Sequence, residues 1–359
     1  MNRHSKSHSA IIVFTMVALL TLILHPLSVK SSKEFTAVNE YSLLPQQCCL
    51  EFNGTRAFTY LEDQCAFGPR PPGSSNLTAC GDYIIASLEN QGWNIQTQTW
   101  THLDTPLRNI IAGASSSPRY VLLAHYDTRP IADMDPHPQN RTQPILGAND
   151  GASGVAALLE LASVLPEGAQ NAVTLLFVDA EDSGNWNGWE YIVGSTYYVN
   201  SLTESQKNNI QAAVLLDMMG DADLQLKHEL SSTPSLVNAI WQIAADLQYD
   251  DAFLDIPGYN IGDDHRPFLR AGIPAIDIID FDYPSWHTLE DTPDKCSPDS
   301  LEAVGRVVED FVQQQLVAPT IFRVTDPWLL SLIFTLMVLV IVVISLILLV
   351  IWRKRQRVD

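Results

Sequence analysis

Imidazole and carboxylate side chains follow four apolar runs of this 359-residue chain, each at the point where the run ends. In chain order they are His125 and Asp127, then Asp150 from a glycine-containing loop, the stretch 179–182, Asp217, and finally Asp280, Asp282 and His287. Imidazole and carboxylate groups without thiolates suit a catalytic zinc ion, which takes nitrogen and oxygen ligands and keeps one position open. The sequence therefore predicts zinc chemistry.

The elements that must position these side chains alternate between strands and helices. Buried strands are predicted from the runs rich in Val, Ile and Leu at 120–124, 173–178, 213–216 and 275–279, with a further strand at 93–100. Helices are predicted at 78–92, 151–165, 235–247 and 298–315, the last capped by Ser297. This pattern predicts a single doubly wound α/β domain with a largely parallel, mixed central sheet flanked by helices. Ligands of such sheets bind beyond the carboxyl ends of the strands, so the polar groups should converge.

Glu181 and Asp182 are adjacent at one strand end, so their side chains should point in different directions. One of them can bind the metal while the other transfers protons.

Two apolar segments predict membrane insertion. No charged residue occurs over the 25 positions from Trp328 to Trp352, enough to cross ~30 Å of hydrocarbon at ~1.5 Å per residue. The basic stretch 353–357 predicts a cytoplasmic tail and an extracytoplasmic domain before it. The apolar run 10–24 fits a signal peptide or, without a clear cleavage site, an uncleaved signal anchor. The predicted divisions are 1–32 for this N-terminal segment and linker, 33–322 for the catalytic domain, and 323–359 for the transmembrane helix and tail.

Composition removes several classes of partner. The formal charge of -20 would repel phosphate backbones, so nucleic acid is excluded. No Gly-x-Gly-x-x-Gly fingerprint, phosphate loop or Gly-x-Ser-x-Gly elbow occurs, which argues against a nucleotide cofactor and a serine hydrolase. Five cysteines are an odd number for a disulfide-permissive compartment, and Cys65 with Cys80 is the preferred bridge.

From about Phe67 to Phe311 the sequence resembles the zinc aminopeptidase and glutaminyl cyclase superfamily. The motifs that carry the resemblance are, in order, Phe67-Gly-Pro-Arg-Pro-Pro-Gly73, His125-Tyr-Asp127, Gly147-Ala-Asn-Asp150, Glu181-Asp182, Asp217, Asp263-Asp-His265 and Trp286-His-Thr288. The stretch 263–268 and the Trp before the last His are similar to glutaminyl-peptide cyclotransferases. The stretch 129–136, ahead of 144–147, resembles their bacterial branch, and so does aspartate rather than glutamate at position 182.

The resemblance implies one zinc held by Asp150, Asp182 and His287, with Glu181 as the proton-transfer residue. It implies that Asp217 and Asp263 join Glu181 in an acidic chain. The implied reaction is cyclisation of an amino-terminal glutamine of a peptide to pyroglutamate with release of ammonia. The substrate-binding residues that it implies are Trp286, with Trp186 or Trp189 as pocket walls, and Asp264.

Two other functions stay open. In a zinc aminopeptidase, His125 and Asp217 would bind a second metal, whereas in a cyclase they would lie behind the single zinc. A non-catalytic ectodomain of the same fold that binds peptides is disfavoured, because it would have no need to keep Glu181 and every ligand together. The number of zinc ions distinguishes the two enzymes.

Overall fold

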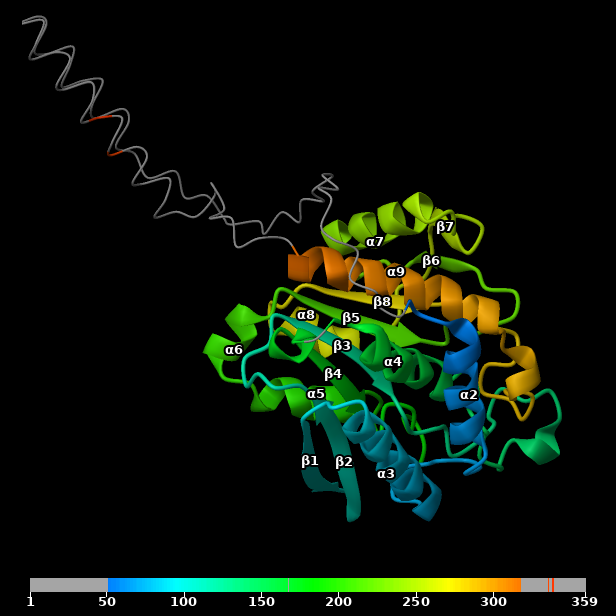
Figure 1. Ribbon diagram of the computed structural model, residues 1–359. Coiled ribbons are helices and arrows are strands. Elements are labelled where there is room, and N and C mark those ends of the chain that lie inside the picture. The colour runs from blue at the N-terminus through cyan, green and yellow to red at the C-terminus, as the bar shows by residue number, and fades with distance from the viewer. Residues whose placement is uncertain (1–50, 167, 318–334, 336–337, 339–359) are drawn as a thin grey trace, which may run out of the picture. The chain divides into compact units, whose positions relative to one another are not determined.

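The computed structural model describes residues 51–166 and 168–317, together with Thr335 and Val338 (Figure 1). Its central sheet has the strand order β1-β2-β4-β3-β5-β8. The strands are β1 (Ile95–His102), β2 (Thr105–Ala112), β3 (Tyr120–His125), β4 (Val173–Val178), β5 (Ala212–Asp217) and β8 (Ala275–Ile279). Strands β4, β3, β5 and β8 run parallel, whereas β1 and β2 form an antiparallel hairpin at one edge. The predicted largely parallel, mixed sheet is confirmed.

The four parallel strands are buried along their whole length, as their continuous apolar sequences predict. Strand β1 alternates between exposed and partly buried positions because it lies at the edge of the sheet. A separate two-stranded parallel sheet pairs β6 (Leu226–His228) with β7 (Phe253–Pro257). The sequence patterns did not predict β2, β6 or β7, which are short or carry polar residues.

The main helices of the described part are α2 (Gly54–Cys65), α3 (Ser75–Asn90), α4 (Ala152–Val164), α5 (Val193–Ser201), α6 (Glu204–Asn209), α7 (Pro234–Asp246), α8 (His265–Arg270) and α9 (Pro298–Val317). All four predicted helices are present with boundaries within a few residues. Helix α2 is not among the predicted helices. The Asn53 side chain caps it by accepting a hydrogen bond from Arg56 N. Helix α2 packs against α4 and α9.

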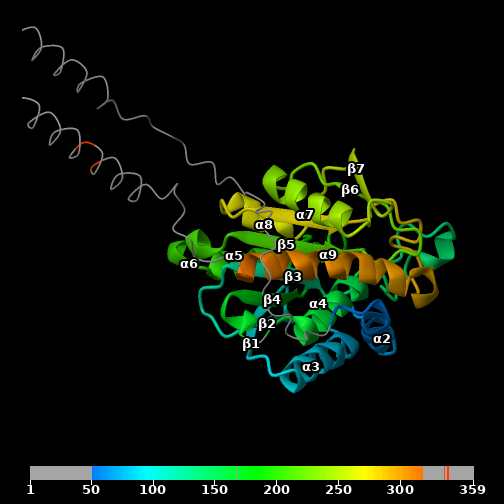
Figure 2. The same cartoon turned by 45° about the horizontal axis from the view of Figure 1, so that its top comes forward.

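Helices cover both faces of the sheet (Figures 1 and 2). On one face α4 crosses β5 so closely that a Cβ atom on Gly154 would lie 2.0 Å from the Leu216 carbonyl oxygen. On the other face Tyr198 of α5 and Phe268 of α8 join the inward side chains of β3, β4 and β5 in one apolar core. The doubly wound prediction is therefore correct, and α4 is fixed between the loop of Asp150 and the strand of Asp217.

No helix in the described ranges is long and apolar enough to cross a membrane. Both predicted membrane segments, 10–24 and 328–352, lie outside the described residues, apart from Thr335 and Val338. They stay predictions, as do the divisions at 32 and 322.

The predicted Cys65–Cys80 disulfide is wrong. Cys65, Cys80 and Cys296 are all free thiols with buried side chains. Cys65 ends α2, whereas Cys80 lies within α3. Spacing along the sequence does not specify how two helices place their thiols, which is why it misled here.

Candidate metal and catalytic site

The carboxyl ends of the parallel strands bring the predicted residues together. His125 is the last residue of β3 and Asp217 the last residue of β5, while Glu181 and Asp182 follow the end of β4. Residue His125 pairs with Val178 across the sheet, so the ends of β3 and β4 are level. The site therefore lies where the sequence places it, beyond one edge of a parallel sheet.

Two groups of side chains in this region have the geometry of metal ligands, and Asp150 belongs to both. The first group is Asp150, Asp182 and His287, and the second is His125, Asp150 and Asp217, with the ligand atoms of each group within 4.8 Å of one another. His287 Nε2 lies 3.5 Å from Asp150 Oδ2 and 3.3 Å from Asp182 Oδ1. His125 Nε2 lies 3.3 Å from Asp150 Oδ1 and 3.2 Å from Asp217 Oδ1.

Burial makes a cation the natural partner of these carboxylates. All five side chains are buried, and Asp150 Oδ2 and Asp182 Oδ2 receive no hydrogen bond. A buried carboxylate oxygen without a donor is costly unless a positive charge neutralises it. Imidazole nitrogens and carboxylate oxygens are ligands that zinc accepts, so the residues fit a zinc ion.

The outer ring nitrogens of both histidines are fixed by acceptors. His125 Nδ1 lies 3.2 Å from the backbone oxygen of Asp127, and His287 Nδ1 lies 3.2 Å from Asp133 Oδ1. Since a carbonyl or carboxylate oxygen can only accept, Nδ1 must carry the proton in each ring. That tautomer leaves Nε2 of each ring for a metal.

Buried charged residues hold the backbone next to the ligands. Asp127 accepts hydrogen bonds from the amides of Glu181 and Asp182 at 3.0 and 3.2 Å. Asp291 accepts from the amides of Asn149 and Asp150 at 2.8 and 3.1 Å. The role of Asp291 was missed, because nothing in its polar loop sequence distinguishes it from an exposed aspartate.

Arg70 is a second residue whose role was missed. Its guanidinium is fully buried and donates to the carbonyl oxygens of Leu146 and Gly147 at 3.0 and 2.9 Å. These carbonyls belong to the loop that carries Asp150. The Phe67 to Gly73 motif, which supported the family resemblance, is thus tied to the metal-site loop.

Glu181 lies in a cluster of buried acids with Asp217 and Asp263. Burial raises the pKa of Glu181 well above its usual range, and the charges of Asp182 and Asp217 raise it further. Burial also raises the pKa of Asp263, which interacts electrostatically with Asp217 and Glu181. A carboxyl group with a raised pKa can accept and return a proton near neutral pH.

Of the predicted substrate-binding residues, Trp286 lies nearest the ligands. Its ring stacks on that of His287, with 3.9 Å between centroids. Trp189 packs edge-on against His102 of β1 at 5.1 Å, and its backbone amide donates to the carbonyl of Trp186.

Asp264 is fully buried and accepts a hydrogen bond from Ser195. Substrate contact by Asp264 stays a prediction.

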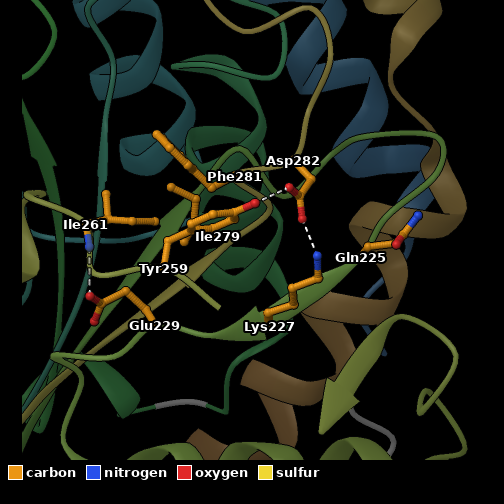
Figure 3. A pocket seen from close by; sticks show the side chains of 8 residues that line it. All are labelled: Gln225, Lys227, Glu229, Tyr259, Ile261, Ile279, Phe281 and Asp282. Carbon is orange, nitrogen blue, oxygen red and sulfur yellow. Dashed lines mark hydrogen bonds and ion pairs between the residues drawn. The ribbon is translucent and has the colours of Figure 1, made fainter. Parts of the chain in front are cut away.

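A small hollow adjoins this aromatic region (Figure 3). Its lining includes Phe281, whose ring lies 5.1 Å from that of Trp286. On its rim Asp282 accepts a hydrogen bond from Tyr259 at 2.6 Å and pairs with Lys227. Ring contacts from Phe281 to Trp286 and from Trp286 to His287 therefore connect the lining of the hollow with a predicted metal ligand. None of the predicted metal ligands lines the hollow itself.

Comparison with known proteins agrees with this geometry. Residues 109–312 match the family described as Peptidase family M28. A curated relative, glutaminyl-peptide cyclotransferase of Drosophila melanogaster, is 26% identical over 288 residues, covering 70% of this chain and 78% of that protein.

Solved structures are similar over most of the described chain. Porphyromonas gingivalis glutaminyl cyclase has a TM-score of 0.69 and 33% identity, covering 74% of this chain and all of that one. A zinc-dependent exopeptidase from Parabacteroides distasonis has a TM-score of 0.69 and 32% identity, covering 74% and 99%. The chain therefore belongs to peptidase family M28, and its resemblance to bacterial glutaminyl cyclases is confirmed.

Proposed function

We propose that this chain is a zinc-dependent glutaminyl-peptide cyclotransferase, which converts the amino-terminal glutamine of a peptide to pyroglutamate and releases ammonia. The observation that carries the proposal is the place of Glu181, a buried carboxyl group of raised pKa directly beside the ligand Asp182. Two of the relatives named above, from Drosophila melanogaster and Porphyromonas gingivalis, are glutaminyl cyclases.

The proposed metal site consists of Asp150, Asp182 and His287, and it would hold one zinc ion per chain. Bound there, zinc supplies a Lewis acid for the carbonyl oxygen of the glutamine side-chain amide. His125 and Asp217 then lie behind the site, where Asp217 raises the pKa of Glu181.

Glu181 performs the proton transfer. The α-amine nitrogen of the substrate bonds to the side-chain carbonyl carbon, and the bond from that carbon to the amide nitrogen breaks. Glu181 accepts a proton from the amine and returns it to the leaving nitrogen, which departs as ammonia. Trp286 provides one wall for the glutamine side chain, because its ring already lies on His287.

A direct test uses the purified full chain, stripped of metal and titrated with zinc. It is incubated with a peptide that begins with Gln and a matched peptide that begins with Leu, and the products are read by mass spectrometry. Loss of ammonia from the first peptide alone, saturating at one zinc per chain, is the expected result. Release of a free amino acid from either peptide would reject the cyclase.

The second candidate is a zinc aminopeptidase, favoured by one observation. The group His125, Asp150 and Asp217 completes a two-metal arrangement with the first group, and a similar structure is named a zinc-dependent exopeptidase. In that enzyme Glu181 would act as base toward the water that attacks the first peptide bond. Activity that requires two zinc ions per chain and releases amino acids would support it.

We also propose that residues 33–322 lie outside the cytoplasm, anchored by the segment 328–352. The support is the uncharged length of that segment and the basic stretch 353–357 after it. Protease added to intact cells should remove the catalytic domain and leave a tag at the C-terminus protected.

A further inference from the structure

The backbone of His287 is held in an uncommon conformation. Its φ angle is 55°, in the left-handed region that residues other than glycine rarely adopt. A residue persists in this region only when its surroundings hold it there, and such positions cluster at functional sites. The residues that hold His287 come from a segment more than 150 positions earlier in the chain.

That segment runs from Arg129 to Asp135 and makes three contacts with the loop of His287. Asp133 Oδ1 lies 3.2 Å from His287 Nδ1, so it fixes the ring. The amide of Met134 donates to the carbonyl oxygen of His287 at 3.2 Å. Asp135 Oδ2 accepts from the amide of Leu289 at 3.1 Å. The segment therefore holds both the imidazole ring and the backbone of His287.

Arg129 connects this arrangement to another predicted ligand. Its guanidinium is only 1% exposed and donates to both carboxylate oxygens of Asp133 at 2.7 Å. The same group donates to Asp182 Oδ1 at 3.1 Å and leaves Asp182 Oδ2 without a donor. One planar cation thus orients the Asp133 carboxylate behind His287. It also bonds one oxygen of Asp182 and leaves the other oxygen available to a metal. A lysine ammonium lacks the forked geometry needed for both tasks.

We propose that Arg129 and Asp133 are positioning residues that set the affinity and geometry of the metal site. Neither residue belongs to the proposed ligand set, and both act through His287 and Asp182. The inference rests on the proposed zinc function of those two ligands. Carboxylates that accept from the outer nitrogen of a metal-bound histidine have this effect in zinc proteins, where their loss weakens metal affinity about 10- to 100-fold.

The test measures zinc binding directly, besides activity. Full-length Asp133→Asn and Arg129→Lys variants are stripped of metal, and the zinc dissociation constant is measured by competition with a chromophoric chelator. Each variant should bind zinc about 10- to 100-fold more weakly than the wild type. The visible absorption spectrum of the cobalt(II)-substituted protein should also change, because the ligands move relative to the metal.

Asp82→Asn is the matched control. Asp82 pairs with Arg108 at 2.7 Å, and its side chain is 64% exposed on α3. Like Asp133→Asn, this substitution removes the negative charge of an aspartate that pairs with an arginine, but this pair contacts no predicted ligand. Its zinc affinity and cobalt spectrum should equal those of the wild type. If Asp133→Asn does not yield folded protein, Asp133→Glu, which keeps the charge, should give an intermediate zinc affinity.

The outcomes separate this inference from the proposed function. A wild-type chain that binds no zinc would reject the proposed metal site itself. Wild-type zinc affinity and an unchanged cobalt spectrum in both variants would overturn the positioning role alone. A lower melting temperature with unchanged metal binding would also overturn it, because the segment would then serve only folding.

Discussion

The amide nitrogen of Glu181 lies 3.0 Å from Asp127 Oδ1. Asp127 follows the end of β3 and Glu181 follows the end of β4, so a hydrogen bond between neighbouring strand ends sets the backbone of the proposed proton-transfer residue. The second oxygen of Asp127 accepts from the amide of Asp182. The Asp127 carboxylate therefore fixes the backbone of both the proposed proton-transfer residue, Glu181, and the proposed metal ligand, Asp182.

Replacing Glu181 by glutamine should lower kcat by about 10²- to 10⁴-fold, the usual contribution of a positioned general acid or base. Zinc affinity should stay within about twofold of the wild type, because Glu181 is not in the proposed ligand set. Steady-state kinetics at saturating zinc, with ammonia as the measured product, checks the result. Glu204→Gln, on a residue whose side chain is 84% exposed on α6, is the control. Full activity in Glu181→Gln would assign the proton transfer to another residue.

Glu229 should make stability depend on pH. Burial opposes its ionisation, but His265 and the amides of Ile261 and Ser231 outweigh burial and lower the pKa of Glu229 to about 2. A pKa below the unfolded value of 4.5 means that the ionised group stabilises the fold above pH 4.5, and that this stabilisation is lost as pH falls toward 2.

Glu229→Gln should therefore unfold at a lower urea concentration than the wild type at pH 7. The difference between the two midpoint urea concentrations should be smaller at pH 3. Urea titrations followed by tryptophan fluorescence at both pH values measure it. A gap of equal size at both values would mean that the charge of Glu229 is not what stabilises the fold.

Cys65, Cys80 and Cys296 should react as slow thiols in the folded protein. Burial raises the pKa of Cys65 to about 11, so little thiolate is present at pH 7. An alkylating reagent should label these residues only after unfolding, without prior reduction. Peptide mapping by mass spectrometry separates them from Cys48 and Cys49. Labelling of Cys65 and Cys80 that requires a reductant would restore the disulfide predicted from sequence.

Gly154→Ala should destabilise the fold by about 1–3 kcal/mol, the usual cost of overpacking. The new Cβ atom would meet the Leu216 carbonyl at 2.0 Å, and neither backbone can move freely. Zinc affinity should fall as well, since α4 lies next to Asp150 and β5 ends at Asp217. Chemical denaturation and zinc titration measure the two effects. Gly262→Ala, where the Cβ atom meets nothing within 4 Å, is the matched control for stability and should unfold as the wild type does.

Several features could be predicted from the sequence because they depend on local patterns. The four parallel strands are continuous apolar runs, and α9 begins at a proline preceded by a serine whose hydroxyl accepts from Asp299 N. The metal-site residues followed from the same patterns, since the ends of parallel strands meet at one edge of the sheet. Helix α2 was missed because it carries many polar residues and is stabilised by contacts with α4 and α9.

What the sequence by itself determined was the α/β architecture, the candidate ligands and the reaction class that the family motifs imply. These depend on periodicity and on side-chain chemistry, which are local properties. Only the tertiary structure decided that Asp150 is shared by both ligand groups, that Arg129 contacts Asp182, and that Cys65 and Cys80 are separate thiols. Such relationships join residues of different helices, strands and loops, and the packing of the sheet and its helices sets the distances between them.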